Sequence, residues 1–351
     1  MSLAVQAAAD TEYPKATRPT LYFIGVTTGK SSIMSVFPRW AEHLGLGGAA
    51  IRGIDCKWHD RPEVYRRAVE HLRGDELSLG ALVTTHKIDL LEACRDLFDD
   101  LDPCARLMGE VSCISKRDGR LIGHAKDPIT SGLALEAFLP PGHWERTSGE
   151  ALVLGAGGSS IAVTSFLMDP CHGANRPSRI VVTNRSTPRL EEIRRIHQRG
   201  EKGVRSILPE RPATDLRSVP GFAQNAPDPF FPPAVRYVHT PRPEDNDALV
   251  SALNPHSLVI NATGLGKDAP GSPITAAARF PEHGYAWDFN YRGELVFLDQ
   301  ARAQQQARGL GIEDGWVYFL HGWTQVIAQV LHIDLTPELF AHLAEVAAEV
   351  R

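Results

Sequence analysis

Apolar positions along the first part of the chain follow two periods, that of a buried strand and that of an amphipathic helix. Short apolar runs of strand length alternate with segments in which apolar residues recur every three or four positions. The order strand, helix, strand, helix, strand predicts a mainly parallel sheet with helices on both faces. We expect strands at 21–26, 49–54 and 79–83 and helices at 33–46 and 61–72.

The segment from Gly109 to Ala125 has a different pattern, which predicts a hairpin. Its two apolar arms, EVSCIS and RLIGHA, flank Lys116-Arg117-Asp118-Gly119, which is a turn of the Asp-Gly type. A helix is expected at 129–138, and it ends at Leu139-Pro140-Pro141-Gly142. Because clustered proline and glycine interrupt regular structure, this segment indicates a domain boundary.

A second alternation of strands and helices follows this boundary and predicts a second α/β layer arrangement. Residues 205–234 interrupt it; they are rich in proline and polar groups, and we interpret them as a surface excursion without regular structure. The end of the chain, from about 318 to 350, is expected to be largely helical. The expected strands are 152–154, 180–183, 235–239, 258–262 and 285–289, and the expected helices include 159–168 and 188–198.

Length and charge narrow the function classes. A chain of 351 residues exceeds one typical domain, so we expect two. The formal net charge of −5 gives no support to a nucleic-acid or anionic-membrane partner, which would favour a basic surface. No apolar stretch is long enough to span a membrane, and residues 1–20 lack a signal-peptide core. We therefore expect residues 1–20 to form a flexible tail on a cytoplasmic protein.

The cysteines and histidines predict neither a disulfide framework nor a metal site. The five cysteines are an odd number, widely spaced, and form no C-x-x-C pair. We expect them to be small buried side chains with free thiols. The 14 histidines include no H-E-x-x-H arrangement, so no metal is assigned.

The most specific local motif is the glycine-rich segment Leu152–Ala162, in which an apolar strand runs into a turn and a helix start. Gly155 permits the tight turn, and Gly157 allows the backbone to approach a pyrophosphate. The small residues Ser160 and Ala162 allow close packing of the helix on the strand. A phosphate would lie at the helix N-terminus, where free N–H groups attract an anion. We interpret the motif as a dinucleotide site; the alternative is a structural tight turn.

The end of the next strand distinguishes two cofactors. An NAD site normally has an acidic residue there, which binds the ribose 2′-hydroxyl. This chain has Asn184 followed by Arg185, with Arg189 one turn further on. Because a guanidinium suits a phosphate, NADP is favoured over NAD, although NAD stays an alternative. Both arginines could instead be the solvated start of a helix.

Together these motifs resemble those of the shikimate/quinate dehydrogenase family, in order from about residue 21 to 335. Asn261-Ala262-Thr263-Gly264-Leu265-Gly266 is similar to the family loop N-A-T-x-x-G, which lies beside the nicotinamide. Asp288-Phe289-Asn290-Tyr291 resembles the strand end D-x-x-Y, and Asp314-Gly315 resembles the last cofactor-domain strand and its return helix. The cofactor-binding residues that the resemblance implies are Gly155, Ala156, Gly157, Gly158, Ser159, Asn184, Arg185, Ser186, Asn261, Ala262, Thr263 and Gly315.

The resemblance implies a two-domain α/β fold. A discontinuous N-terminal α/β domain, residues 21–128 with 318–351, would hold the substrate and the catalytic groups. Residues 129–317 would form a Rossmann-type, doubly wound parallel sheet that binds NADP.

Two further matches imply a catalytic pair. Val83-Thr84-Thr85-His86-Lys87 occupies the place of N-V-T-x-P-x-K, so Lys87 matches the catalytic lysine. Gly123-His124-Ala125-Lys126-Asp127 occupies the place of G-x-N-T-D, so Asp127 matches the catalytic aspartate. The chemistry suits these residue types, because oxidation of an alcohol requires a base at the hydroxyl and a partly desolvated lysine can exchange a proton near neutral pH.

The chain departs from the family mainly at positions that recognise shikimate. The second serine of S-x-S is Ile33, and the glutamine of the last helices aligns with Gly322, three residues before Gln325. Several hydrogen bonds to ring hydroxyls therefore cannot form as in the family. The other replacements are Ala81 for asparagine, Val83 for threonine, Ser112 for asparagine, and Ala125 with Lys126 before Asp127.

We therefore expect retained redox chemistry with a changed substrate, a small hydroxylated, anionic and cyclic compound. Lys30, Lys126 and His124 add cationic or ionisable groups near the aligned cleft, although they could instead point to water. Trp316, Tyr318, Phe319 and Trp323 are interpreted as core. The expected substrate-binding residues are Ser31, Ser112, Lys126, Tyr291 and Gln325.

Three other interpretations of the activity stay open. The enzyme could be a genuine shikimate or quinate dehydrogenase. The chain could instead bind a dinucleotide without turnover, as a sensor does. The same lysine and aspartate could serve a dehydratase or an isomerase. For partners, we expect only a small-molecule substrate, with the chain a monomer or a homodimer.

Overall fold

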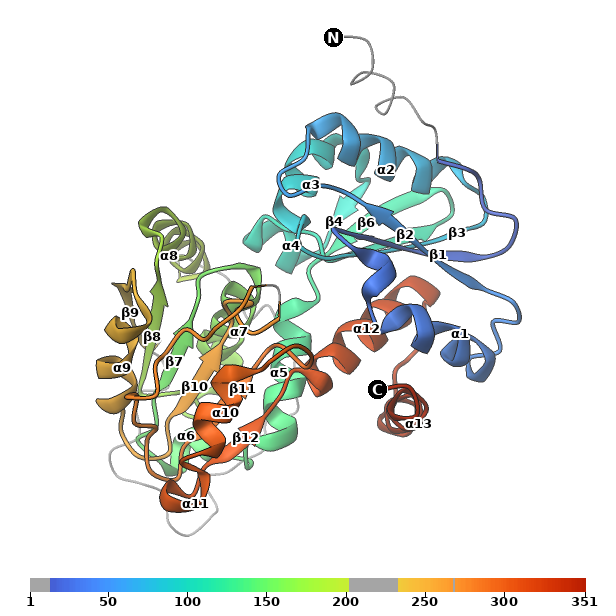
Figure 1. Ribbon diagram of the computed structural model, residues 1–351. Coiled ribbons are helices and arrows are strands. Elements are labelled where there is room, and N and C mark those ends of the chain that lie inside the picture. The colour runs from blue at the N-terminus through green and yellow to red at the C-terminus, as the bar shows by residue number, and fades with distance from the viewer. Residues whose placement is uncertain (1–12, 202–232, 268) are drawn as a thin grey trace, which may run out of the picture. The chain divides into compact units, whose positions relative to one another are not determined.

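The computed structural model describes residues 13–201, 233–267 and 269–351. Most of the predicted tail 1–20 and nearly all of the predicted excursion 205–234 lie outside these residues. The chain divides into two compact units (Figure 1). The first unit comprises the residues up to Lys126 together with Gly322–Arg351, and the second comprises Asp127–His321.

The first unit is built on a mixed sheet of order β2-β1-β3-β5-β6-β4. Strands β1, β2 and β3 pair in parallel, β5 pairs antiparallel with both β3 and β6, and the short β4 pairs in parallel with β6. The predicted hairpin is thus present, with its turn at Asp118-Gly119. The strands are β1 (Thr20–Gly25), β2 (Ala50–Asp55), β3 (Ser78–Val83), β4 (Asp100–Leu101), β5 (Cys113–Arg117) and β6 (Arg120–His124).

Helices of this unit come from both ends of the chain. The first helix, α1 (Ile33–His43), ends earlier than the predicted residue 46. The chain turns there through Gly45 and Gly48, whose positive φ angles suit glycine. The last helix, α13 (Pro337–Ala348), is fixed to α1 by a hydrogen bond from the Trp40 indole to the Leu343 carbonyl. The helices are α1 (Ile33–His43), α2 (Pro62–Gly74), α3 (Lys87–Cys94), α4 (Pro103–Met108) and α13 (Pro337–Ala348), with α12 (Trp316–Leu331) continuing from the second unit.

The second unit has a sheet of order β12-β11-β10-β7-β8-β9, and all of its paired strands are parallel. This order is that of a doubly wound dinucleotide-binding fold, which confirms the predicted fold class. Its strands are β7 (Ala151–Leu154), β8 (Arg179–Asn184), β9 (Ala234–His239), β10 (Leu258–Asn261), β11 (Tyr285–Asp288) and β12 (Gly311–Glu313). Its helices are α5 (Asp127–Phe138), α6 (His143–Arg146), α7 (Gly158–Met168), α8 (Thr187–Glu201), α9 (Pro243–Ser251), α10 (Val296–Arg302) and α11 (Gln305–Arg308).

The strand order determines where a ligand would bind in the second unit. All four residues of β7 are fully buried, as expected for a central strand covered on both faces. The order reverses between β7 and β10, and in open α/β sheets ligands bind beyond the carboxyl ends of the strands at such a reversal. The loops after β7 and β10 are therefore the first places to look for a site.

Four of the five cysteines are buried, as predicted. For Cys171, which is exposed, the prediction was wrong. Cys171 lies in a short 3-10 helix after α7. No group of three metal-binding side chains occurs within residues 13–201, 233–267 and 269–351. In the same described residues, no helix is both long and apolar enough to cross a membrane.

Lys116 caps the C-terminal end of α2 in the first unit. The Lys116 ammonium, on β5, donates to the carbonyls of Leu72, Arg73 and Asp75 at 3.1, 2.9 and 2.7 Å. Leu72 and Arg73 belong to the last turn of α2, where carbonyls lack partners within the helix, and Asp75 follows it, its carbonyl also accepting from Ser78 N. The contact therefore stabilises α2 on the sheet.

Replacement of Lys116 by methionine keeps the aliphatic stem and removes these three hydrogen bonds. We expect the free energy of unfolding to fall by about 1–3 kcal/mol, measured by urea denaturation. Arg117→Met is the matched control, since Arg117 is the exposed neighbouring residue. Equal stability of the two variants would contradict the capping role.

Candidate active site

Lys87 lies at the carboxyl end of the parallel strands of the first unit, as the first residue of α3. The loop before it is held by the backbone bond from Thr84 N to Ile24 O, and Thr85 has a φ of 66°. The Lys87 carbonyl accepts from Val111 N at 3.1 Å. The lysine is half-buried. A helix N-terminus disfavours a nearby positive charge.

His86 supports this lysine from inside the unit. Its side chain is 1% exposed, and its Nδ1 lies 3.2 Å from the Tyr65 hydroxyl. Burial lowers the pKa of His86, which keeps the ring neutral at neutral pH. The residue that begins α3 is thus anchored by a packed, uncharged side chain immediately before it.

Asp127 is the first residue of α5 and is 9% exposed. The Thr130 hydroxyl donates to the Asp127 carbonyl at 3.1 Å and ties the first turn together. Asp127 belongs to the second unit, whereas Lys87 belongs to the first.

Two of the predicted substrate-binding residues, Ser112 and Lys126, lie together in the first unit. The Ser112 hydroxyl accepts from the Lys126 backbone N–H at 2.8 Å and is itself buried. The Lys126 ammonium donates to the Oε1 atom of Gln329, on α12, at 2.5 Å. Ser112 therefore acts on the backbone of Lys126, and Gln329 is a contact that the sequence patterns did not indicate.

His124 points into the interior of the first unit. Its Nε2 lies 2.8 Å from the Ser115 hydroxyl and its Nδ1 lies 3.5 Å from Asp102 Oδ2. Burial alone would raise the pKa of Asp102, but hydrogen bonds from His124 and the Ala105 N–H lower it overall. Ser115 is 1% exposed, so this chain of side chains braces β5, β6 and α4.

The other predicted residues of this unit lie on its loops and on α12. Ser31 follows a 3-10 helix at Thr28–Lys30, and its N–H donates to the Thr28 carbonyl. On α12, an ideal Cβ at Gly322 would have no neighbouring atom within 4 Å. Gln325, one turn later on the same helix face, is half-buried. The position where the resemblance places a glutamine is thus open space.

The aromatic residues of α12 are mostly packed. Trp316, Phe319 and Trp323 are buried, which confirms their expected core role. Tyr318 is half-buried and stacks on Phe289 at 4.8 Å between ring centroids. Tyr291, predicted to face the substrate, contacts the Phe319 ring at 4.8 Å.

In the second unit, the glycine turn after β7 has the geometry of a phosphate cradle. Gly155 has a φ of 116°, and an added Cβ would come 2.7 Å from the Ala262 carbonyl, so only glycine fits without strain. Gly157 precedes α7, and a Cβ there would meet nothing within 4 Å. The first N–H groups of α7 begin at Gly158, beside this open space.

The end of β8 carries the predicted arginines. Asn184 Oδ1 accepts from Ser186 N at 2.9 Å, which shapes the turn. Arg185 is exposed and forms no ion pair with any residue that the structure describes. Arg189, in contrast, lies 2.7 Å from Glu192 Oε2. Arg185 is therefore the arginine whose charge is available at this strand end.

The loop after β10 is fixed by a buried polar network. Asn261 Oδ1 accepts from the N–H and the hydroxyl of Thr263, and Asn261 Nδ2 donates to Asp288 Oδ2 at 2.9 Å. Asp288 also accepts from Asn290 N at 2.8 Å. Burial raises the pKa of Asp288 to about 6, and the nearby Asp314 charge adds to the increase. The hydrogen bonds from Asn261 and Asn290 act in the opposite direction and lower it. Gly315 packs against the Phe289 carbonyl, where a Cβ would clash.

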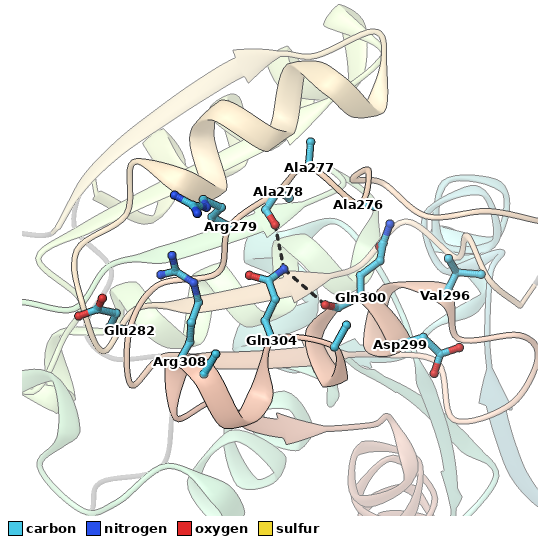
Figure 2. Close-up of a pocket in the computed structure, with 12 residues that line it drawn as sticks. Ala276, Ala277, Ala278, Arg279, Glu282, Val296, Asp299, Gln300, Gln304 and Arg308 are labelled. Carbon is cyan, nitrogen blue, oxygen red and sulfur yellow. Dashed lines mark hydrogen bonds between the residues drawn. The ribbon is translucent and has the colours of Figure 1, made fainter.

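A groove of about 650 Å³ elsewhere in the second unit holds none of the predicted residues (Figure 2). It lies along α10 and α11, and its glutamines serve the backbone: Gln304 Nε2 donates to the Ala278 carbonyl at 2.9 Å and Gln300 Nε2 to the Ile274 carbonyl at 3.0 Å. The groove is therefore distinct from the loops after β7 and β10.

Comparison with known proteins confirms the resemblance stated above. No family model matches the chain. A shikimate dehydrogenase (NADP(+)) from Streptococcus thermophilus is 29% identical over 275 residues, 77% of this chain and 80% of the relative. Two solved structures share the fold: quinate dehydrogenase from Corynebacterium glutamicum in complex with NAD (TM-score 0.65, 18% identity, 95% and 99% coverage) and 5-ketofructose reductase of Gluconobacter (TM-score 0.60, 18% identity, 96% and 100% coverage).

The buried carboxyl of Asp288 generates a pH prediction. Because its folded pKa of about 6 exceeds the ordinary aspartate value of 3.8, ionisation destabilises the fold as pH rises from about 4 to 6. In Asp288→Asn this cost is absent. Relative to the wild type, we expect the variant's unfolding free energy to gain about 2–3 kcal/mol between pH 4 and pH 7. Denaturation series across this range measure the difference. Asp299→Asn, at an exposed residue, is the control, and a flat difference for Asp288→Asn would refute the prediction.

Proposed function

Because this chain is homologous to the shikimate dehydrogenases, we propose that it is an NADP-preferring oxidoreductase. It reversibly oxidises a secondary alcohol of a small hydroxylated substrate to a ketone by hydride transfer. The observation that carries the proposal is the glycine turn, which combines a residue that must be glycine with an open helix start at the switch point of a parallel sheet.

The residues of the second unit fit a dinucleotide phosphate. Gly157 leaves room for a pyrophosphate at the N-terminus of α7, because a side chain there would occupy that space. The Arg185 guanidinium is available for a 2′-phosphate, which supports NADP over NAD. The Thr263 loop, fixed by Asn261 and Asp288, provides a rigid surface for the nicotinamide end.

In the proposed reaction, a residue of the first unit accepts the proton of the substrate hydroxyl. NADP supplies the hydride acceptor. The Lys87 amine takes the hydroxyl proton of the alcohol, and its place at the start of α3 favours the neutral form that a base requires. The Asp127 carboxylate orients the ammonium that forms and helps to place the hydroxyl.

The substrate is an alcohol other than shikimate. Ser112, which replaces an asparagine, is occupied by the Lys126 backbone, and Gly322 leaves the glutamine position empty. Each buried hydroxyl left without its partner would cost about 1–3 kcal/mol. The Gluconobacter neighbour is named for the reduction of 5-ketofructose, so this fold also occurs with another named substrate. Genuine shikimate dehydrogenase activity is the alternative.

The function is tested with NADP and a panel of hydroxy acids, cyclitols and sugar acids. We expect Lys87→Met to lower turnover of the best substrate by about 10²–10⁴-fold, because the general base is lost, while NADP binding is retained. Formation of NADPH, followed by absorbance, measures turnover, and fluorescence titration measures binding. Lys57→Met, at an exposed lysine, is the control.

Three outcomes would contradict this assignment. Shikimate turnover equal to that of the best panel member would refute the changed substrate. Tight NADP binding without oxidation of any alcohol would indicate a sensor. Product formation without a change in NADPH would indicate a dehydratase or an isomerase.

Two glycine variants test the cofactor cradle separately from stability. Gly155→Ala places a Cβ 2.7 Å from the Ala262 carbonyl at a φ of 116°, so we expect a loss of about 1–3 kcal/mol in unfolding free energy as well as weaker NADP binding. Gly157→Ala meets no protein atom within 4 Å, so we expect near-normal stability with NADP affinity reduced at least tenfold. Unchanged NADP affinity in Gly157→Ala would place the cofactor elsewhere.

A further inference from the structure

The half-buried Lys126 ammonium has a single, neutral hydrogen-bond partner among the described residues. Its hydrogen bond goes to the neutral amide oxygen of Gln329, and no carboxylate of the described residues lies within ion-pair distance of it. Two other half-buried cations of the first unit have fuller sets of partners: Arg66 pairs with Asp96, and Lys116 donates to three carbonyls at the end of α2. Because a partly desolvated charge attracts an opposite charge strongly, Lys126 is suited to bind an anion.

The ionisable groups around Lys126 do not neutralise it. Burial raises the pKa of the Cys113 thiol to about 12, and the Lys126 charge, which acts in the opposite direction, does not overcome this. Asp102 interacts with the His124 ring and with the Ala105 N–H. Neither of these groups therefore forms an ion pair with Lys126.

Gln329 is oriented by this contact. An ammonium only donates hydrogen bonds, so the amide oxygen must face Lys126 and the amide nitrogen must point away. Gln329 Nε2 has no acceptor among the residues that the structure describes. The pair thus presents N–H donors from an ammonium and from an amide, which suits the two oxygens of a carboxylate.

The location of this pair relates it to the substrate. Lys126 directly precedes Asp127, and its backbone is fixed by Ser112. Gln329 lies one turn after Gln325 and two turns after Gly322, on one face of α12. At the S-x-S element, Ile33 is fully buried, so one of the two serine hydroxyls that would hold a carboxylate there is missing.

We propose that Lys126 and Gln329 form the anchor for a carboxylate of the substrate and so determine specificity for hydroxy acids. This inference rests on the proposed function and extends it to residues of the first unit alone. Lys126 supplies the charge. Gln329 holds the ammonium without neutralising it and adds an N–H donor of its own.

Matched substrates test the anchor. Each hydroxy acid that is oxidised is compared with its methyl ester, which keeps the alcohol and lacks the charge. We expect Lys126→Met to raise KM for the acid by about ten- to a hundredfold, with a smaller effect on kcat and little change for the ester. Lys57→Met is the control. An equal effect on acid and ester would overturn the proposal.

Two variants of Gln329 separate the anchor from a structural role. Gln329→Leu removes the positioning contact, so KM for the acid should rise several-fold. Gln329→Glu places a carboxylate on Lys126 and should raise KM for the acid further, because the charge is then neutralised internally. If Gln329 only stabilises the fold through Lys126, the new ion pair would leave KM at the wild-type value, and that result would also overturn the proposal. Gln306→Leu, at an exposed residue of the second unit, is the control.

A chemical readout keeps this test independent of turnover. Reductive methylation of lysines, quantified by peptide mass spectrometry, is run with and without shikimate, quinate or gluconate as carboxylate probes. We expect protection of Lys126 and none of Lys57. Protection without turnover of any alcohol would refute the proposed function and support the anchor. Turnover without protection, and without an effect of Lys126→Met on acids, would refute the anchor and leave the function standing.

Discussion

The junction between a parallel strand and the following helix is the constraint on which the candidate site depends. At such a junction the backbone emerges at the sheet edge and begins a helix whose first N–H groups have no internal partner. Lys87 lies at this place after β3, and Gly157 lies there after β7. Asp127 also begins a helix, after the hairpin of the first unit. The same backbone geometry therefore positions the proposed base, its proposed carboxylate partner and the proposed phosphate cradle.

Side chains at these junctions differ in how their charges are compensated. Asp288 is buried among hydrogen bonds from Asn261 and Asn290, and it holds a loop without meeting a cation there. Lys126 shows the reverse case, because a neutral amide accepts its hydrogen bond. Polar groups that are fully satisfied make a structure rigid, whereas a charge with only a neutral partner can still bind a ligand. This difference separates the supporting residues from those available to a substrate.

Local patterns predicted what local physics determines. The glycine turn follows from the φ angle of Gly155, and the hairpin follows from the Asp118-Gly119 turn, so both could be predicted from the sequence. The two-residue strand β4 carries too few positions for a period, so it was missed. Gln329 was missed because its contact with Lys126 joins residues 203 positions apart, and only the spacing of four from Gln325 hinted at it.

Two replacements, Ser112 and Gly322, both remove side-chain groups that bind shikimate in the resembled family. With Ser112 used by the backbone and Gly322 without a side chain, few groups remain to orient hydroxyls around a ring. A charge-assisted hydrogen bond is stronger than one between neutral groups, so a charged residue can replace part of the lost binding. An exposed lysine would be screened by salt, and one paired with a carboxylate would repel an anion. A half-buried lysine on an amide avoids both effects, which is the physical reason for the carboxylate anchor proposed at Lys126.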